Sequence, residues 1–292
     1  MKRKTWFWAL TPVAVALSLY GCGNGSDSDL AVDNNAQSCS VVSGTGSAVV
    51  VGSGLPGDPA APEAASGYRL GYKAKQSSNY MVVANTPLAT KAGCDVLKAG
   101  GTAVDAAVAV QAVLGLVEPQ SSTIAGSAFM MYYDAANKKV VAYDGRETAP
   151  AAATGYYLAR QDQSNASSPA PVPSARRSGR SIGVPGVMRM LDMAHKEHGK
   201  LAWAPLFDEG IRLASSGYKI PGRMGDAIRT NAANLQLDAN AVAAYFNADG
   251  TPKTTGTVTT NLPYAQSLRT LATGGADAMY SGPLAEALVA KA

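Results

Sequence analysis

The sequence has few residues of the kinds that bind metal ions. Its 292 residues include 2 histidines and 3 cysteines. Zinc sites in proteins are built from three or four Cys, His or carboxylate ligands at regular spacings, and no such spacing is present. His195 and His198 are three residues apart and could form a metal-binding pair on a helix, but no third ligand is evident. We therefore predict no metal site and no cofactor.

The sequence also has little net charge. Its formal charge is +4, and Lys2, Arg3 and Lys4 contribute three of these charges, so the rest of the chain is near +1. Proteins that bind nucleic acid present a strongly basic face or stripe. We therefore predict no nucleic-acid partner.

Long apolar runs are missing as well. The run over residues 6–19 is shorter than the about 18 residues of a membrane span, and Pro12 interrupts it, so a transmembrane anchor is the weaker interpretation. A basic start followed by a short apolar segment and small residues is typical of a secretory signal. The sequence Leu-Tyr-Gly-Cys, which ends at Cys22, resembles a bacterial lipobox. It implies a lipoprotein signal peptide over 1–21 and lipidation of Cys22.

The composition changes after the predicted cleavage site. Residues 22–78 are poor in large apolar side chains and rich in Gly, Ser, Ala, Pro and Asp, which predicts a lipidated flexible linker. The globular domain is predicted over 79–292. Gly23, rather than Asp, follows the lipidated cysteine, which favours the outer membrane of a Gram-negative cell. We predict an exported protein held to the cell envelope by lipid and facing the periplasm.

Two cysteines remain if Cys22 is lipidated. An exported compartment permits disulfides, so Cys39 and Cys94 can pair and fix the N-terminal region to a helix. Alternatively, Cys94 is a small apolar core residue and Cys39 a free surface thiol. The sequence leaves both interpretations open, because the distance between the two residues decides between them.

The most informative stretch of the domain, residues 85–153, begins with two helices. Thr86 is followed by proline, which is typical of the start of a helix, and this helix is predicted to end at Gly100. Thr102 precedes a second helix, predicted over 103–117. The second helix is apolar on nearly every face, which predicts burial between protein layers.

A hairpin with strands at 128–134 and 139–144 is predicted next, from residues that favour strands on either side of a turn. Arg146 lies just after the end of the second strand. Its forked guanidinium can bind a carboxylate through two hydrogen bonds, which makes it a candidate anion-binding residue. The more ordinary alternative is a structural ion pair with Asp144 or Glu147.

The remaining elements follow from weaker patterns. Residues 81–84 are predicted to form a first core strand, and residues 240–260 a loop. Residues 151–180 are predicted to be an exposed loop, whose cluster of Arg176, Arg177 and Arg180 is interpreted as solvated rather than anion-binding. Helices are predicted over 184–197, 203–215, 262–273 and 283–291.

Several motifs of the domain resemble one family. They are AGGTAVDAAVAV at 99–110, DGRETAP at 144–150, GVPGVMRMLDMAHKEHGKLAW at 183–203, LFDEGIRLASSGY at 206–218 and, more weakly, ADAMYSGPLAEALVA at 276–290. In this order they resemble the large-subunit region of the γ-glutamyltransferases (glutathione hydrolases). The resemblance covers roughly residues 80–292.

The resemblance implies an α+β fold, part of the four-layer αββα sandwich of N-terminal-nucleophile hydrolases. The γ-glutamyltransferases cut their own precursor before a threonine. That threonine then attacks the γ-glutamyl amide of glutathione and passes the acyl group to water or an amino acid. By resemblance, Arg146 holds the α-carboxylate of the γ-glutamyl group, so ligand binding now outweighs the structural ion pair. The implied partners are a γ-glutamyl substrate and the C-terminal, small-subunit half of the precursor.

The sequence departs from the family pattern in two places. Residues 124–128 have fewer glycines than the family's glycine-rich run before the first strand of the hairpin, which puts the geometry there in question. The 292 residues also end before the family's threonine. We therefore assign no catalytic residue, and expect an incomplete, inactive fold with an exposed apolar face. The alternatives are a non-catalytic lipoprotein that binds γ-glutamyl compounds, and a related acylase acting on β-lactam side chains or poly-γ-glutamate.

Overall fold

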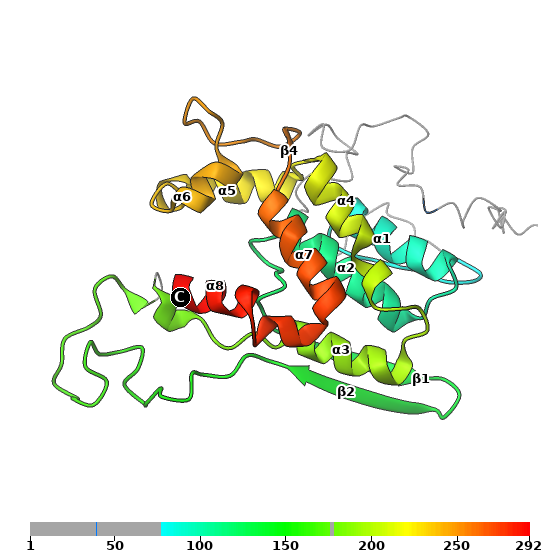
Figure 1. Cartoon of the computed structure of the whole chain (residues 1–292), viewed down its shortest axis with the longest axis horizontal. Helices are drawn as coiled ribbons and strands as arrows, with labels where there is room; N and C mark the ends of the chain where they lie inside the picture. Colours follow the sequence, from blue (N-terminus) through cyan, green and yellow to red (C-terminus); the bar gives the residue numbers. More distant parts are fainter. Residues whose placement is uncertain (1–38, 40–76, 176–177) are drawn as a thin grey trace, which may run out of the picture. The chain divides into compact units, whose positions relative to one another are not determined.

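The computed structural model describes residue 39 and residues 77–175 and 178–292 (Figure 1). All of them belong to one compact unit, Asn35–Ala292. The predicted signal peptide, Cys22 and nearly all of the linker lie outside the described residues, as do Arg176 and Arg177. The lipid anchor and its location in the cell therefore stay predictions. None of the described helices is both long and apolar enough to cross a membrane.

The described residues form helices and two small antiparallel sheets, β1–β2 and β3–β4, so the predicted α+β class is confirmed. The α-helices are α1 (Pro87–Lys98), α2 (Ala103–Val117), α3 (Val187–His198), α4 (Asp208–Ser216), α5 (Gly222–Leu235), α6 (Ala239–Tyr245), α7 (Leu262–Gly274) and α8 (Pro283–Lys291). The strands are β1 (Ala128–Asp134), β2 (Lys139–Gly145), β3 (Tyr218–Lys219) and β4 (Val258–Thr259). Short 3-10 helices are η2 (Gly179–Ser181), η3 (Ala204–Phe207) and η4 (Ala276–Met279).

Helices α1 and α2 begin at their predicted residues because threonine side chains cap them. The hydroxyl of Thr86 accepts a hydrogen bond from the backbone N–H of Ala89, at 3.2 Å. Thr102 and Asp105 form a reciprocal capping box at the start of α2. The predicted ends of both helices are confirmed.

Helix α2 lies at the centre of the described fold, where it contacts α1, α3 and α4 and accepts a hydrogen bond from Tyr264 of α7 (Figure 1). One side of α2, including Val104 and Val108, belongs to a buried cluster with α3, η3 and α7. The other side, including Val113 and Leu116, belongs to a second cluster with α1, α4 and α5. Its burial on both sides, predicted from its all-round apolar sequence, is confirmed.

The buried carboxylate of Asp105 ties the start of α2 to the segment after α3. Its Oδ2 accepts hydrogen bonds from the backbone N–H groups of Thr102 at 2.7 Å, Lys200 at 3.0 Å and Leu201 at 3.3 Å. Its Oδ1 lies 3.3 Å from Nε2 of His195. Because the side chain is 0% exposed, these contacts replace the water that a carboxylate otherwise needs.

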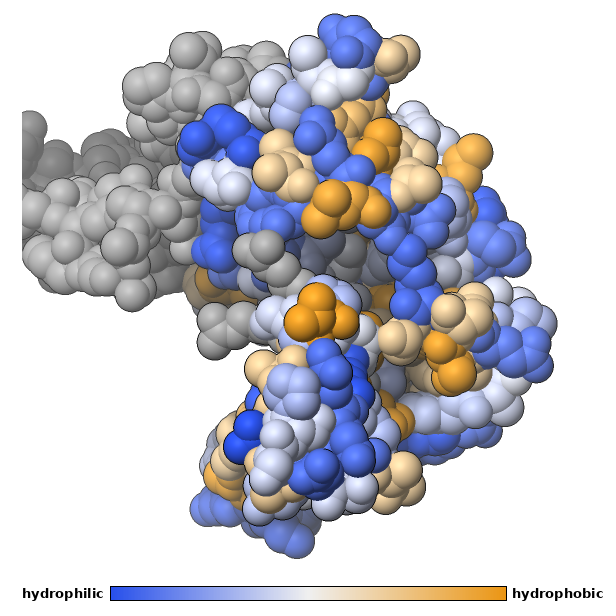
Figure 2. Space-filling view, turned by 90° about the vertical axis from the view of Figure 1, so that its left-hand side faces the viewer, coloured by the Kyte–Doolittle hydropathy of each residue, from blue (hydrophilic) through white to orange (hydrophobic). Residues whose placement is uncertain are grey.

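The predicted hairpin is confirmed, with Ala128 opposite Gly145 and Asp134 opposite Lys139. One face of the β1–β2 hairpin packs on α3. The opposite face, here called the outer hairpin face, exposes large apolar side chains: Phe129 at 68%, Met131 at 69%, Tyr133 at 60% and Val140 at 56%. On the side of the molecule drawn in Figure 2, by contrast, hydrophobic groups form separate patches among hydrophilic ones. The outer hairpin face is the exposed apolar surface expected from the sequence.

Two predicted elements are wrong. Residues 81–84 form no strand, and Met81 and Val83 are 50% and 84% exposed. Burial alternates along this segment, but in the described part of the chain no strand pairs with it. Residues 240–260 are not all loop, since Asp238 caps α6 through hydrogen bonds from Asn240 and Ala241.

The other helix predictions are confirmed, with one refinement. The helix predicted over 203–215 is divided into η3 and α4. Helix α5, which the sequence analysis did not predict, forms because Met224 and Ile228 are buried in the cluster shared with α1, α2 and α4.

Candidate functional site

Arg146 directly follows β2, and its side chain is 61% exposed. Its Nη2 lies 3.1 Å from Oε1 of Glu147, and its Nη1 donates a hydrogen bond to the hydroxyl of Ser127 at 3.3 Å. Asp144 contacts the backbone instead, since its carboxylate accepts from the N–H of Arg146 at 2.9 Å. Of the two ion pairs considered from the sequence, the structure contains the one with Glu147.

The environment of Glu147 keeps this residue negatively charged. A hydrogen bond from the Ser127 hydroxyl lowers the pKa of the Glu147 carboxyl below its ordinary value, and the nearby guanidinium of Arg146 acts in the same direction. Ser127 therefore contacts both members of the ion pair. The three side chains form a small polar cluster, here called the Arg146 cluster.

The backbone of residues 183–187 supports the Arg146 cluster. The N–H of Val184 donates to the carbonyl of Thr148 at 2.9 Å, and that of Gly186 donates to the carbonyl of Gly126 at 3.0 Å. A Cβ atom on Gly186 would lie 2.2 Å from the carbonyl oxygen of Gly145. Glycine is therefore required here by the close approach of two backbones.

The cluster has the chemistry of a carboxylate-binding site. A guanidinium carries five N–H groups in a planar fork, and the described residues engage two of those of Arg146. The exposed remainder can form the two parallel hydrogen bonds by which arginine binds a carboxylate. The geometry thus permits an anionic ligand in addition to the ion pair with Glu147.

The structure also places the other candidate residues from the sequence. Cys39 and Cys94, the latter on α1, are joined by a disulfide with a Cα–Cα distance of 5.5 Å. His195 hydrogen-bonds the carbonyl of Leu201 at 2.9 Å, and the ring of His198 stacks on Tyr132 at 4.0 Å, so these two histidines have different partners. The described residues contain no group of three or more potential metal ligands.

Two residues of this site were not predicted from the sequence. Ser127 lies in the segment where the family has a glycine-rich run. The smaller number of glycines at 124–128 was the available signal that Ser127 contacts Arg146. Gly186 precedes α3 in the motif Val-Pro-Gly, which reads as an ordinary helix start. Its contact with Gly145 joins segments about forty residues apart and leaves no local pattern.

Comparison with known proteins yields a consistent set of relatives. The family model described as gamma-glutamyltranspeptidase matches residues 89–292. The chain is 37% identical over 215 residues to glutathione hydrolase 3 of Arabidopsis thaliana, an alignment covering 73% of this chain and 32% of the relative. It is 34% identical over 211 residues to the glutathione hydrolase proenzyme of Bacillus subtilis, covering 71% and 34%. The chain thus spans about a third of the length of these curated relatives.

A solved structure is similar in fold. The gamma-glutamyltranspeptidase of Helicobacter pylori aligns with a TM-score of 0.67 and 27% sequence identity. The alignment covers 74% of this chain and 60% of that one. The fold expected from the sequence motifs is therefore shared with a member of the same family.

Proposed function

The chain belongs to the γ-glutamyltranspeptidase family, and from this we propose that it forms the large-subunit portion of an exported enzyme that cleaves γ-glutamyl amides such as glutathione. The observation that carries the proposal is the Arg146 cluster. It presents a partly free guanidinium at the end of a strand, within the DGRETAP motif. The motifs at 99–110 and 144–150, which resemble the family's large-subunit region, support the large-subunit assignment.

In the proposed reaction Arg146 orients the substrate. Its guanidinium binds the α-carboxylate, and fixing that end of the γ-glutamyl group directs the γ-carbonyl toward a nucleophile. A threonine hydroxyl, supplied by the small-subunit portion, adds to the γ-carbonyl carbon. The C–N bond then breaks, and the amine leaves with a proton. Water or an amino acid next attacks the ester and releases the acyl group.

Replacing Arg146 with lysine is expected to weaken binding of L-glutamate and glutathione by about 10- to 100-fold. Lysine keeps the positive charge but cannot form the paired hydrogen bonds, and hydrogen bonds to charged groups contribute about 1.5–3 kcal/mol. Calorimetric titration of the 292-residue chain measures the effect. The matched control is Arg229→Lys, because Arg229 is 69% exposed and also pairs with an acidic neighbour, Asp226. Equal affinities for wild type and Arg146→Lys would refute the assignment.

A release assay separates the enzyme from the alternative of a binding protein. The substrate is a chromogenic γ-glutamyl anilide, and the chain is expressed together with the small-subunit portion of a family precursor. Release of the aniline supports acyl transfer. Binding of glutathione with no release in this combination favours a non-catalytic lipoprotein.

We further propose that the outer hairpin face packs against the small-subunit portion. An exposed row of four large apolar side chains is unusual for a surface in contact with water, and it marks an interface. Three of these residues alternate along β1 and Val140 lies opposite Tyr133 on β2, as side chains do on a sheet face that packs on a second sheet.

The chain without a partner is therefore expected to bind the dye ANS with a several-fold rise in fluorescence. The double variant Phe129→Ser, Met131→Ser should lose most of this signal, because it removes the centre of the apolar row. Met193→Ser is the control, since Met193 is 49% exposed but lies on α3. An ANS-silent wild-type chain with a cooperative melting transition would contradict the proposal.

A further inference from the structure

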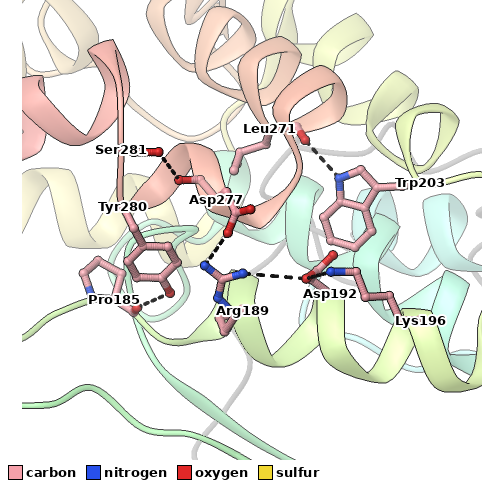
Figure 3. Close-up of polar contacts among 9 residues, drawn as sticks. All are labelled: Pro185, Arg189, Asp192, Lys196, Trp203, Leu271, Asp277, Tyr280 and Ser281. Carbon is pink, nitrogen blue, oxygen red and sulfur yellow. Dashed lines mark hydrogen bonds and ion pairs between the residues drawn. The ribbon is translucent and has the colours of Figure 1, made fainter.

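We propose that Tyr280 is a positioning residue that holds the Arg146 cluster in its binding geometry, through the peptide bond between Pro185 and Gly186. This inference rests on the proposed function, since it concerns how the carboxylate-binding arginine is held. Figure 3 shows the residues around Tyr280, which lies just after η4. The carbonyl of Pro185, in the turn before α3, accepts a hydrogen bond from the Tyr280 hydroxyl at 2.5 Å (Figure 3).

The ring of Tyr280 is itself held in place by Arg189. The guanidinium carbon of Arg189 lies 4.7 Å from the centre of the ring, in a cation–π contact. Nη2 of Arg189 also donates to the carboxylate of Asp277 at 2.6 Å, and its Nη1 lies 3.9 Å from Asp192. These contacts join η4 to the first turn of α3 and fix the direction of the Tyr280 hydroxyl (Figure 3).

Neighbouring contacts anchor the same two elements. The indole N–H of Trp203 donates to the carbonyl of Leu271 at 2.9 Å, which joins the segment after α3 to α7. Lys196 pairs with Asp192 at 2.8 Å on α3, and the hydroxyl of Ser281 donates to the carbonyl of Asp277 at 3.3 Å (Figure 3). The segment from α7 to η4, which precedes Tyr280, is thus connected to α3 through Asp277 and to the residues after α3 through Leu271.

The peptide unit between Pro185 and Gly186 transmits the position of Tyr280 to the site. A peptide unit is planar and rigid, so its C=O and N–H move together. The C=O is held by Tyr280, and the N–H donates to the carbonyl of Gly126 at 3.0 Å. Gly126 precedes Ser127, whose hydroxyl contacts the guanidinium of Arg146.

The same peptide unit also lies against the backbone of the arginine. A Cβ on Gly186 would be 2.2 Å from the carbonyl oxygen of Gly145 and 3.1 Å from that of Arg146. Because the two backbones are packed so closely, a rotation of this peptide unit would also displace Arg146. Loss of the Tyr280 hydroxyl would therefore loosen both the backbone of Arg146 and its side-chain contact with Ser127.

The charge states support this arrangement. Burial raises the pKa of the Tyr280 phenol, so the hydroxyl stays protonated and able to donate near neutral pH. The hydrogen bond with Asp277 raises the pKa of Arg189, which remains a cation under the ring. Pairing with Asp277 leaves the cation electrostatically balanced.

The test is Tyr280→Phe, which keeps the ring over Arg189 and removes only the hydroxyl. Calorimetry with L-glutamate on the 292-residue chain is expected to show binding weakened about 3- to 10-fold, which is the loss of one hydrogen bond. Hydrogen exchange should become faster at the amides of 145–148 and 184–187 and unchanged in α2. Tyr156→Phe is the control, because Tyr156 is 46% exposed and lies in the loop before η2. Two further variants test the cation under the ring. Arg189→Lys should keep part of the affinity for L-glutamate, and Arg189→Gln should not.

The outcomes separate this inference from the function on which it rests. If Arg146→Lys weakens binding but Tyr280→Phe changes neither affinity nor exchange, the positioning role is wrong and the function stands. If the chain binds neither L-glutamate nor glutathione even together with the small-subunit portion, the proposed function fails. Exchange then decides the positioning role alone, since faster exchange at 145–148 supports it and unchanged exchange overturns it.

Discussion

Replacing Gly186 with alanine is expected to weaken binding of γ-glutamyl ligands by about 100-fold, because misplacing a binding group by about 1 Å can have an effect of this size. The new methyl group would lie 2.2 Å from the carbonyl oxygen of Gly145, closer than any real carbon contact. The backbone angles of Gly186, φ −120° and ψ −23°, are open to alanine, so the effect is steric rather than conformational. One of the two backbones must move, and Arg146 moves with it.

Calorimetry with L-glutamate and urea unfolding together measure this effect. We expect the free energy of unfolding to fall by about 1–3 kcal/mol, as for other overpacked sites. Gly155→Ala is the control, because a Cβ there meets nothing within 4 Å. Wild-type affinity in a folded Gly186→Ala protein would show that this contact does not position Arg146.

Replacing Asp105 with alanine is expected to lower the free energy of unfolding by about 3–5 kcal/mol. The carboxylate is buried, and its removal leaves several hydrogen-bond donors without an acceptor. The N–H groups of Lys200 and Leu201 would lose their acceptor, and the capping box with Thr102 would be lost. Helix α2 would be weakened at its start, and both buried clusters depend on α2.

Urea unfolding followed by circular dichroism measures this loss. The control is Asp95→Ala on the neighbouring helix α1, where the carboxylate is 43% exposed and pairs with the exposed Lys91. Exposed pairs of this kind contribute at most about 1 kcal/mol, so the control should remain close to wild type. Similar losses in the two variants would mean that burial of Asp105 does not determine its contribution.

Local patterns correctly predicted the elements whose stability depends on residues that are close in the sequence. The Thr86 and Thr102 caps determine where α1 and α2 begin, and each cap is readable within four residues. The hairpin was predictable because its turn and both strands are continuous in sequence. The segment 81–84 has a strand-like pattern, but a strand also needs a neighbour to receive its hydrogen bonds, and the pattern contains no information about that neighbour.

The candidate site was predictable only in part, for the same reason. The DGRETAP motif identified Arg146, but not which of its two acidic neighbours would pair with it. Ser127, Gly186 and Tyr280 reach the site from distant parts of the chain, so their contacts depend on tertiary packing. Short sequence patterns do not encode such contacts.

The bond between Cys39 and Cys94 closes a covalent ring that contains every residue between them. A single proteolytic cut within this ring would open the backbone and leave the two pieces joined until the bridge is reduced. Whatever lies N-terminal to Cys39 would remain attached to helix α1 after such a cut. A protease could therefore cut the chain between the two cysteines without separating the two pieces.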